Sequence, residues 1–181
     1  MYEAIVFFVD GFEEIEAITT LDILRRGNVN VVSVSLTGNH EVTGSHDITV
    51  KTDMVLDGLH DIQGSMLILP GGPGTATYKK HKLFLELLRL HNSEGGRIAA
   101  ICAAPTVLGV LKILENKTAV CYPTCEDDLH AKKIGQLSTI TDGNITTSKG
   151  PGTSADFALE LVRILKGDSK AAEVATGMLI F

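Results

Sequence analysis

One cysteine stands where a buried strand is expected to give way to a helix. Residues 98–101 form a continuous apolar run, Ile-Ala-Ala-Ile, which is typical of a buried strand in a parallel sheet. Pro105 follows shortly afterwards, and proline is tolerated in the first turn of a helix because its missing N–H would have no partner there. The segment 97–109 therefore predicts a strand, a sharp turn and a helix, with Cys102 on the turn.

The neighbours of Cys102 favour a reactive thiol. Alanines at positions 100, 103 and 104 allow the close backbone approach that a nucleophile elbow requires. A thiol at the start of a helix faces the positive end of the helix dipole, so we expect its pKa to lie below the usual value of about 8.5. The alternative is a small buried residue that fills a tight corner, since free cysteines are often buried. We favour the reactive interpretation.

Glu16 is the second candidate for chemistry. It lies one turn into a helix predicted over residues 13–26, next to Ile15 and Ala17. A carboxyl in apolar surroundings has a raised pKa and can exchange protons near pH 7. Glu16 could equally be an exposed acid that complements the helix dipole, and the sequence leaves both alternatives open. For Glu13 and Glu14 we expect the exposed arrangement.

Two glycine-rich loops follow predicted strands. Residues 71–74, Gly-Gly-Pro-Gly, lack the Gly-Lys-Ser/Thr ending of a phosphate-binding P-loop. They could form a nest of N–H groups for a small oxyanion, or simply a tight turn. Gly150-Pro151-Gly152 presents the same two alternatives. Ligands of open α/β sheets bind at the carboxyl ends of the strands, where the helix start at 13–16, the loop at 70–74 and Cys102 are expected to lie.

Alternating strands and helices must position these residues. This alternation predicts one α/β domain over residues 1–181, a three-layer sandwich with a mostly parallel sheet. The predicted strands cover residues 2–9, 29–36, 66–69, 98–101 and 118–122, with hairpins at 41–55 and 137–148. The predicted helices cover residues 13–26, 83–92, 126–133, 153–166 and 169–176, and one begins at 105.

Charge and hydropathy exclude several classes of protein. A formal net charge of -6 argues against a nucleic-acid-binding surface, and the basic cluster at 79–82 is expected to be a solvated loop. No apolar run approaches membrane-spanning length, and the chain starts in a predicted strand without a signal peptide. Three cysteines without framework spacing suit a reducing compartment, so we expect a cytoplasmic protein without disulfides.

The remaining cysteines and histidines give weaker signals. Cys121 and Cys125 do not have the spacing of a zinc site, and no metal is expected. We expect Cys121 in the core; Cys125 could resolve an oxidised Cys102, although we do not favour this. The histidines at positions 40, 60, 81, 91 and 130 are expected at the surface.

Four segments together resemble a known family. They are Glu-Glu-Ile-Glu-Ala (13–17), Leu-Pro-Gly-Gly (69–72), Ala-Ala-Ile-Cys-Ala-Ala-Pro-Thr (99–106) and Ser-Lys-Gly-Pro-Gly-Thr-Ser (148–154). In this order they resemble the DJ-1/ThiJ/PfpI superfamily, in its DJ-1 and ThiJ-like branch. The resemblance implies a flavodoxin-like fold of the class I glutamine amidotransferase type, and a homodimer.

The resemblance also implies roles for single residues. Cys102 matches the reactive, easily oxidised cysteine, and Glu16 matches the protonated glutamate that hydrogen-bonds it. The implied backbone donors and surrounding residues are Gly71, Gly72, Ala103, Tyr122, Pro151 and His46. Two of these depart from the family pattern: Tyr122 stands where many members have histidine, and His46 where close relatives have an arginine that reaches the partner's site.

The activities of similar proteins set the functional expectation. Members are described as cofactor-free glyoxalases that make lactate from methylglyoxal, as protein deglycases, as oxidative-stress sensors and as chaperones; some are labelled thiazole monophosphate biosynthesis proteins. Tyrosine, with an unperturbed pKa of about 10, cannot replace histidine as a near-neutral base. We therefore expect a cofactor-free enzyme in which Cys102 and Glu16 act on a small reactive carbonyl, with redox sensing through Cys102 as the alternative.

Overall fold

The structure is a computed structural model and describes residues 1–180. Its strands are β1 (Ala4–Phe8), β2 (Val31–Ser35), β5 (Met54–Val55), β6 (Met66–Leu69), β7 (Ile98–Ile101), β10 (Thr139–Asp142) and β11 (Ile145–Ser148), which form one central sheet. The seven strands follow the order β10-β11-β7-β6-β1-β2-β5. Among the described strands of this central sheet, only β10 and β11 pair in the antiparallel sense. The predicted mostly parallel sheet is confirmed.

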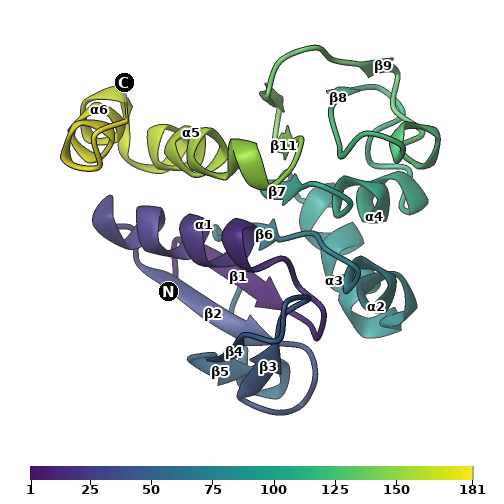
Figure 1. Ribbon diagram of the computed structural model, residues 1–181. Coiled ribbons are helices and arrows are strands. Elements are labelled where there is room, and N and C mark those ends of the chain that lie inside the picture. Colours follow the sequence, from purple (N-terminus) through teal and green to yellow (C-terminus); the bar gives the residue numbers. More distant parts are fainter. Residues whose placement is uncertain (181) are drawn as a thin grey trace.

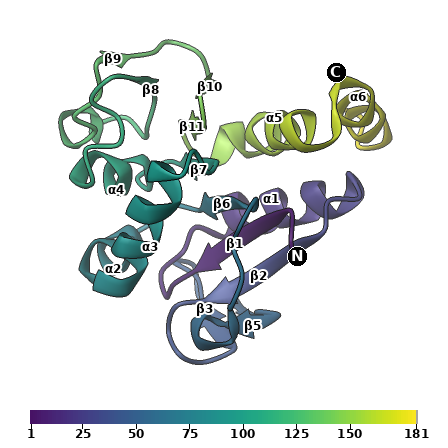
Figure 2. The same ribbon diagram turned by 180° about the vertical axis from the view of Figure 1, so that it is seen from behind.

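Helices cover both faces of this sheet. One face carries α1 (Glu14–Arg26), α5 (Ser154–Lys166) and α6 (Asp168–Gly177); the other carries α2 (Thr75–Lys80), α3 (Lys82–Ser93) and α4 (Pro105–Val110). Both views show α5 lying along α1, with α2, α3 and α4 grouped apart from them (Figures 1 and 2). This is the predicted three-layer sandwich.

The apolar strands are buried on both sides. In β1, Val6 and Phe8 contribute to the core beneath α1 and α5, whereas Ile5 and Phe7 contribute to the core beneath α2, α3 and α4. Successive side chains of a strand point to opposite faces, so a strand covered on both faces reads as an unbroken apolar run. The sequence therefore predicts these strands well.

Two small sheets flank the central one. β3 (Glu41–Thr43) and β4 (Thr49–Lys51) form an antiparallel hairpin over the first part of the hairpin predicted at 41–55. The last two residues of that prediction instead form β5, which pairs in parallel with β2 in the central sheet. β8 (Thr118–Ala119) pairs in parallel with β9 (Lys133–Ile134). Single turns of 3₁₀ helix are η1 (Leu56–Gly58), η2 (Glu126–Asp128) and η3 (Pro151–Thr153). Within residues 1–180, no helix combines the length and apolar character needed to cross a membrane.

Three predicted elements are wrong. The strand expected over 118–122 is only β8, and the helix expected over 126–133 is only η2. The left-handed backbone of Thr124 (φ +80°) and His130 (φ +47°) interrupts regular structure on both sides of η2. The basic residues expected in a loop at 79–82 instead end α2 and begin α3. The buried Tyr78 hydroxyl anchors α2 by donating a hydrogen bond to the Phe7 carbonyl at 2.8 Å.

Candidate active site

Cys102 lies on a strained turn between β7 and α4. Its backbone has φ +65°, which a residue with a side chain rarely adopts. Two neighbouring segments hold the turn: the Cys102 N–H donates to the Ser148 carbonyl (3.0 Å), and its own carbonyl accepts from the Tyr122 N–H (2.8 Å). The cysteine is 7% exposed. The predicted strand, sharp turn and helix are therefore present, with the thiol at the carboxyl end of the sheet.

Glu16 is a buried carboxyl beside this thiol. It is fully buried, and its Oε2 atom accepts the Gly71 N–H at 2.8 Å. Burial raises the pKa of Glu16 to about 7, against the opposing effect of hydrogen bonds from the Cys102 thiol and the Gly71 N–H. Of the two alternatives that the sequence leaves open, the structure thus has the buried carboxyl. Such a group can exchange a proton near neutral pH.

The second carboxyl oxygen of Glu16, Oε1, is buried. Within the described part of the chain, residues 1–180, no group lies in the position of a regular hydrogen-bond donor to it. The pKa values of Glu16 and Cys102 nevertheless reflect an interaction between carboxyl and thiol. Because sulfur is large and a weak donor, such a contact satisfies the oxygen poorly. A buried charged oxygen without a full hydrogen bond is costly, and protonation of Glu16 relieves that cost.

The prediction that the Cys102 thiol has a lowered pKa is wrong when Glu16 is ionised. Burial, the Glu16 charge and the hydrogen bond to Glu16 raise the pKa of the thiol to about 12, although the N–H groups of Gly72 and Ala103 lower it. The helix start alone suggested a lower pKa, but the nearest ionisable group is a carboxyl. When Glu16 takes up a proton, its charge no longer opposes the thiolate. The two groups are therefore best described as sharing protons.

The loop at 71–72 packs directly against both groups. A Cβ atom on Gly71 would lie 2.6 Å from the Cys102 Cβ and 2.9 Å from Oε2 of Glu16. The loop also accepts the Glu13 N–H at the Gly71 carbonyl (3.0 Å). Its N–H groups face Glu16 and the thiol, so this loop supplies donors to the site rather than serving only as a turn.

Glu13 and Glu14 are not the exposed acids that the sequence predicts. They are 8% and 5% exposed, respectively. The Glu13 carboxylate accepts the Glu16 N–H at 2.7 Å and so caps α1. Glu14 contacts His46, which lies 32 residues further along the chain. No local sequence pattern indicates that contact, because only the tertiary fold brings the hairpin tip to α1.

Tyr122 and Pro151 lie on the two segments that flank the Cys102 turn. Tyr122 is 47% exposed, and its ring packs over Gly150, where an added Cβ would lie 3.2 Å from Cδ2 of the ring. Pro151 is half-buried and begins η3 directly after Gly150. Tyr122 thus connects the 120–122 and 148–151 segments beside the cysteine, while its backbone N–H supports the turn.

The other cysteines lie on the opposite side of the sheet. Cys121 is buried in the core beneath α2, α3 and α4, as expected, and Cys125 packs against the same core. Cys102 belongs to the core beneath α1 and α5, so this arrangement gives no support to Cys125 as its resolving partner. His91, expected at the surface, is 4% exposed, with Nε2 3.2 Å from the Arg97 carbonyl.

The chain matches a known protein family over most of its length. The model of the DJ-1/PfpI family matches residues 2–164. The chain belongs to the DJ-1/PfpI family. It is 37% identical to protein dj-1beta of Drosophila melanogaster over 180 residues, covering 98% of this chain and 96% of that protein. The crystal structure of Drosophila melanogaster DJ-1beta superposes with a TM-score of 0.95 at 36% identity, and the match covers 100% of both chains.

The names of two further similar proteins are informative. The glutathione-independent glyoxalase DJR-1.2 of Caenorhabditis elegans is 33% identical over 160 residues, covering 87% of this chain and 85% of that protein. The structure described as oxidized Toxoplasma gondii DJ-1 superposes with a TM-score of 0.90 at 31% identity and covers 99% of this chain and 98% of the other.

The buried Glu16 carboxyl should make stability depend on pH. Its pKa is raised in the folded protein, so its stabilising contribution is complete below about 4.5, the unfolded value, and is lost as the pH rises through about 7. We expect Glu16→Gln to gain up to about 3 kcal/mol relative to wild type between pH 5 and pH 8. Urea denaturation across this range measures the effect.

The exposed Glu94→Gln serves as the control, and it should keep the wild-type pH dependence. If the free energy of unfolding of Glu16→Gln follows wild type at every pH, Glu16 does not titrate in the way described.

Proposed function

We propose that this protein is a cofactor-free glyoxalase that converts methylglyoxal, or a similarly small dicarbonyl, into a hydroxy acid. The observation that carries the proposal is the buried Glu16 carboxyl beside the Cys102 thiol, with donors from Gly71, Gly72 and Ala103 around them. The relative named glutathione-independent glyoxalase supports the same chemistry. Glu16 provides the proton transfer that a dicarbonyl rearrangement needs, without a histidine at position 122.

The proposed reaction begins when the Cys102 sulfur adds to the aldehyde carbon and forms a hemithioacetal. The thiol proton goes to the aldehyde oxygen, which becomes the hydroxyl of the hemithioacetal. Ionised Glu16 then removes the proton from the former aldehyde carbon and returns it to the adjacent carbonyl carbon, while the hydroxyl proton of the hemithioacetal passes to the oxygen of that carbonyl, which becomes the alcohol. The first carbon is then a thioester of Cys102. Water cleaves this thioester, releases lactate and restores the thiol. The sum is methylglyoxal plus water giving lactate, so no external oxidant or reductant is consumed.

The test is lactate production from methylglyoxal by the purified protein without added glutathione. We expect turnover by wild type and a loss of at least about a hundredfold in kcat for Glu16→Gln, which keeps the shape of the side chain but not its proton exchange. Glu94→Gln is the matched control and should be unaffected. Equal turnover by wild type and Glu16→Gln would contradict the proposed role of Glu16 in proton transfer.

Redox sensing through Cys102 is the second candidate. Donors from Gly72 and Ala103 would stabilise the negative charge of an oxidised sulfur, and a related structure is described as oxidized. We expect mild peroxide to add two oxygens to Cys102 as a sulfinate, detected by mass spectrometry of the intact protein and its peptides. A Cys102–Cys125 disulfide as the main product would instead assign Cys125 a resolving role.

A homodimer is the third part of the proposal. On α1, Ile15 and Ile18 are 55% and 41% exposed although Ala17 and Leu24 are fully buried, so the helix is apolar on two faces. Ile48 on the neighbouring hairpin is also exposed. A second copy of the chain could cover this apolar surface.

We expect light scattering at micromolar concentration to give twice the monomer mass, and Ile18→Glu to give the monomer. A monomeric wild type would contradict the dimer and any contribution of His46 to a partner's site. We also propose that the protein is cytosolic, because its three cysteines are free thiols and a reducing compartment keeps thiols free.

A further inference from the structure

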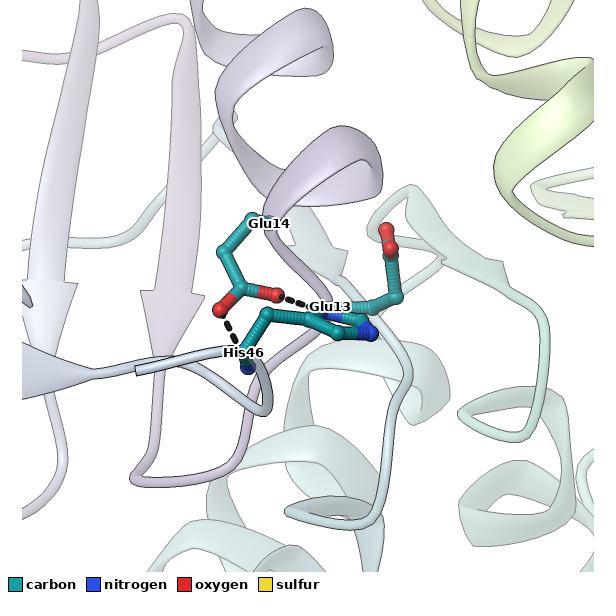
Figure 3. Close-up of side chains that lie close together, drawn as sticks. All are labelled: Glu13, Glu14 and His46. Atoms are coloured by element: carbon teal, nitrogen blue, oxygen red, sulfur yellow. Dashed lines mark hydrogen bonds and ion pairs between the residues drawn. The ribbon is translucent and has the colours of Figure 1, made fainter. Parts of the chain in front are cut away.

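The Glu14 carboxylate is held by the turn between β3 and β4. Oε1 accepts the backbone N–H of His46 (2.6 Å), and Oε2 accepts from Nδ1 of the same histidine (2.7 Å) and from the Ser45 hydroxyl (3.2 Å). Figure 3 shows the two contacts between the carboxylate and His46. Glu14 is buried, whereas the His46 side chain is 70% exposed. A buried carboxylate is thus satisfied almost entirely by an exposed hairpin turn.

Further contacts fasten this turn to the segment before α1. The Ser45 N–H donates to the Phe12 carbonyl (2.8 Å), and the Gly11 N–H donates to the Thr43 carbonyl (2.8 Å). Gly44 lies so close to Glu14 that an added Cβ would overlap the carboxylate. The hairpin turn therefore packs across residues 11–14, and these contacts leave it little freedom to move.

Residues 11–14, which the hairpin turn contacts, lead directly into the Cys102 site. Glu14 and Glu16 share the first turn of α1, and the Glu13 carboxylate caps the Glu16 N–H. The Glu13 N–H donates to the Gly71 carbonyl, while the Gly71 N–H donates to Glu16. These bonds form a closed ring of contacts around the carboxyl that faces the thiol. Movement of this turn would displace the carboxyl, and displacements of about 1 Å can cost a hundredfold in rate.

We propose that Glu14 and His46 are positioning residues, an ion pair between the hairpin turn and α1 that fixes the Glu16 carboxyl against Cys102. The inference deepens the proposed function, since it assigns the pair to the same site. The coupling between His46 and the first turn of α1 does not depend on which reaction the site catalyses.

The pair is also sensitive to pH. The charged groups that face His46 are Glu14, Glu13 and Asp47, all acidic, and the hydrogen bond to Glu14 is the main cause that raises the pKa of the imidazole. Burial raises the pKa of Glu14, but the hydrogen bonds from His46 outweigh it and lower the pKa to about 2. The contribution of the ion pair is therefore complete between about pH 4.5, the unfolded value of Glu14, and about 6.5, the unfolded value of histidine. It is lost as the pH rises through the raised His46 pKa, and also as the pH falls through about 2, where Glu14 takes up a proton.

Hydrogen exchange followed by NMR on the full chain tests the proposal. In His46→Ala we expect the exchange rates of the Ser45 and Glu16 amides to rise at least tenfold. His40→Ala is the matched control: His40 lies on the same hairpin, but its Nδ1 contacts the Thr52 carbonyl instead of α1. His46→Arg keeps a donor and a permanent charge, so it should restore slow exchange and remove the extra rise in exchange that wild type shows as His46 loses its proton.

Alkylation of Cys102 by iodoacetamide across pH 5.5–9 provides a second measurement that needs no turnover. Because Glu16 opposes the thiolate and raises the pKa of Cys102 to about 12, wild type should react slowly throughout this range. In His46→Ala the alkylation rate at pH 9 should rise toward that of an ordinary cysteine, because Glu16 is less firmly held beside the thiol; in His46→Arg the rate should match wild type. In the glyoxalase assay, kcat should fall with KM unchanged. A Glu16 exchange rate in His46→Ala within twofold of wild type, with an unchanged alkylation profile, would overturn the proposal. Absence of glyoxalase activity in wild type would instead count against the proposed function alone.

Discussion

Cys102→Ala should abolish the conversion of methylglyoxal to lactate, with a fall in kcat of at least about a thousandfold. The variant removes the sulfur that forms the bond to the aldehyde carbon, and neither of the other thiols can replace it. Cys121 and Cys125 lie against the core on the opposite side of the sheet. Because alanine keeps the Cβ atom and fits the same small site, we expect the fold to remain intact. Lactate release under saturating substrate measures the effect.

Two further variants make this result specific. Cys125→Ala removes the more exposed of the two remaining thiols and should retain wild-type turnover. Cys102→Ser keeps a hydroxyl of similar size, but a serine oxygen is a much weaker nucleophile than sulfur, so the variant should be nearly as inactive as alanine. Lactate production by Cys102→Ala at the wild-type rate would rule out a covalent step at this residue.

Gly71→Ala should both destabilise the fold and impair the site. The new Cβ would lie 2.6 Å from the Cys102 Cβ, 2.8 Å from the Ile101 carbonyl oxygen and 2.9 Å from Oε2 of Glu16. Two of these neighbours belong to a strand and a strained turn that cannot easily move. We expect a loss of about 1–3 kcal/mol in the free energy of unfolding, as for overpacked sites. Separation of the carboxyl from the thiol should also lower kcat by about a hundredfold.

Gly58→Ala is the matched control, because an added Cβ there meets no atom within 4 Å. It should leave both stability and turnover near wild type. Urea denaturation and the lactate assay measure both variants under the same conditions. A Gly71→Ala protein with wild-type stability and activity would mean that the loop can withdraw from the cysteine, and that its close packing is not required for the site.

The sequence by itself determined the main strands, the long helices and the turn at Cys102. These features depend on neighbours along the chain. An unbroken apolar run such as 98–101 indicates a strand covered on both faces, and Pro105 marks a helix start. The four family-like segments predicted which residues meet at the carboxyl ends of the strands, because the parallel topology brings those ends to one edge.

The tertiary structure alone decided the charge states and burial at the site. Glu13, Glu14 and Glu16 look alike in sequence, yet one caps α1, one pairs with His46 and one faces Cys102. The acidity expected for Cys102 from its helix was reversed by burial and by the Glu16 carboxyl. A pKa depends on the nearest charges, hydrogen bonds and extent of burial. At this site those neighbours come from segments 30 or more residues away in sequence, whose approach no local pattern encodes.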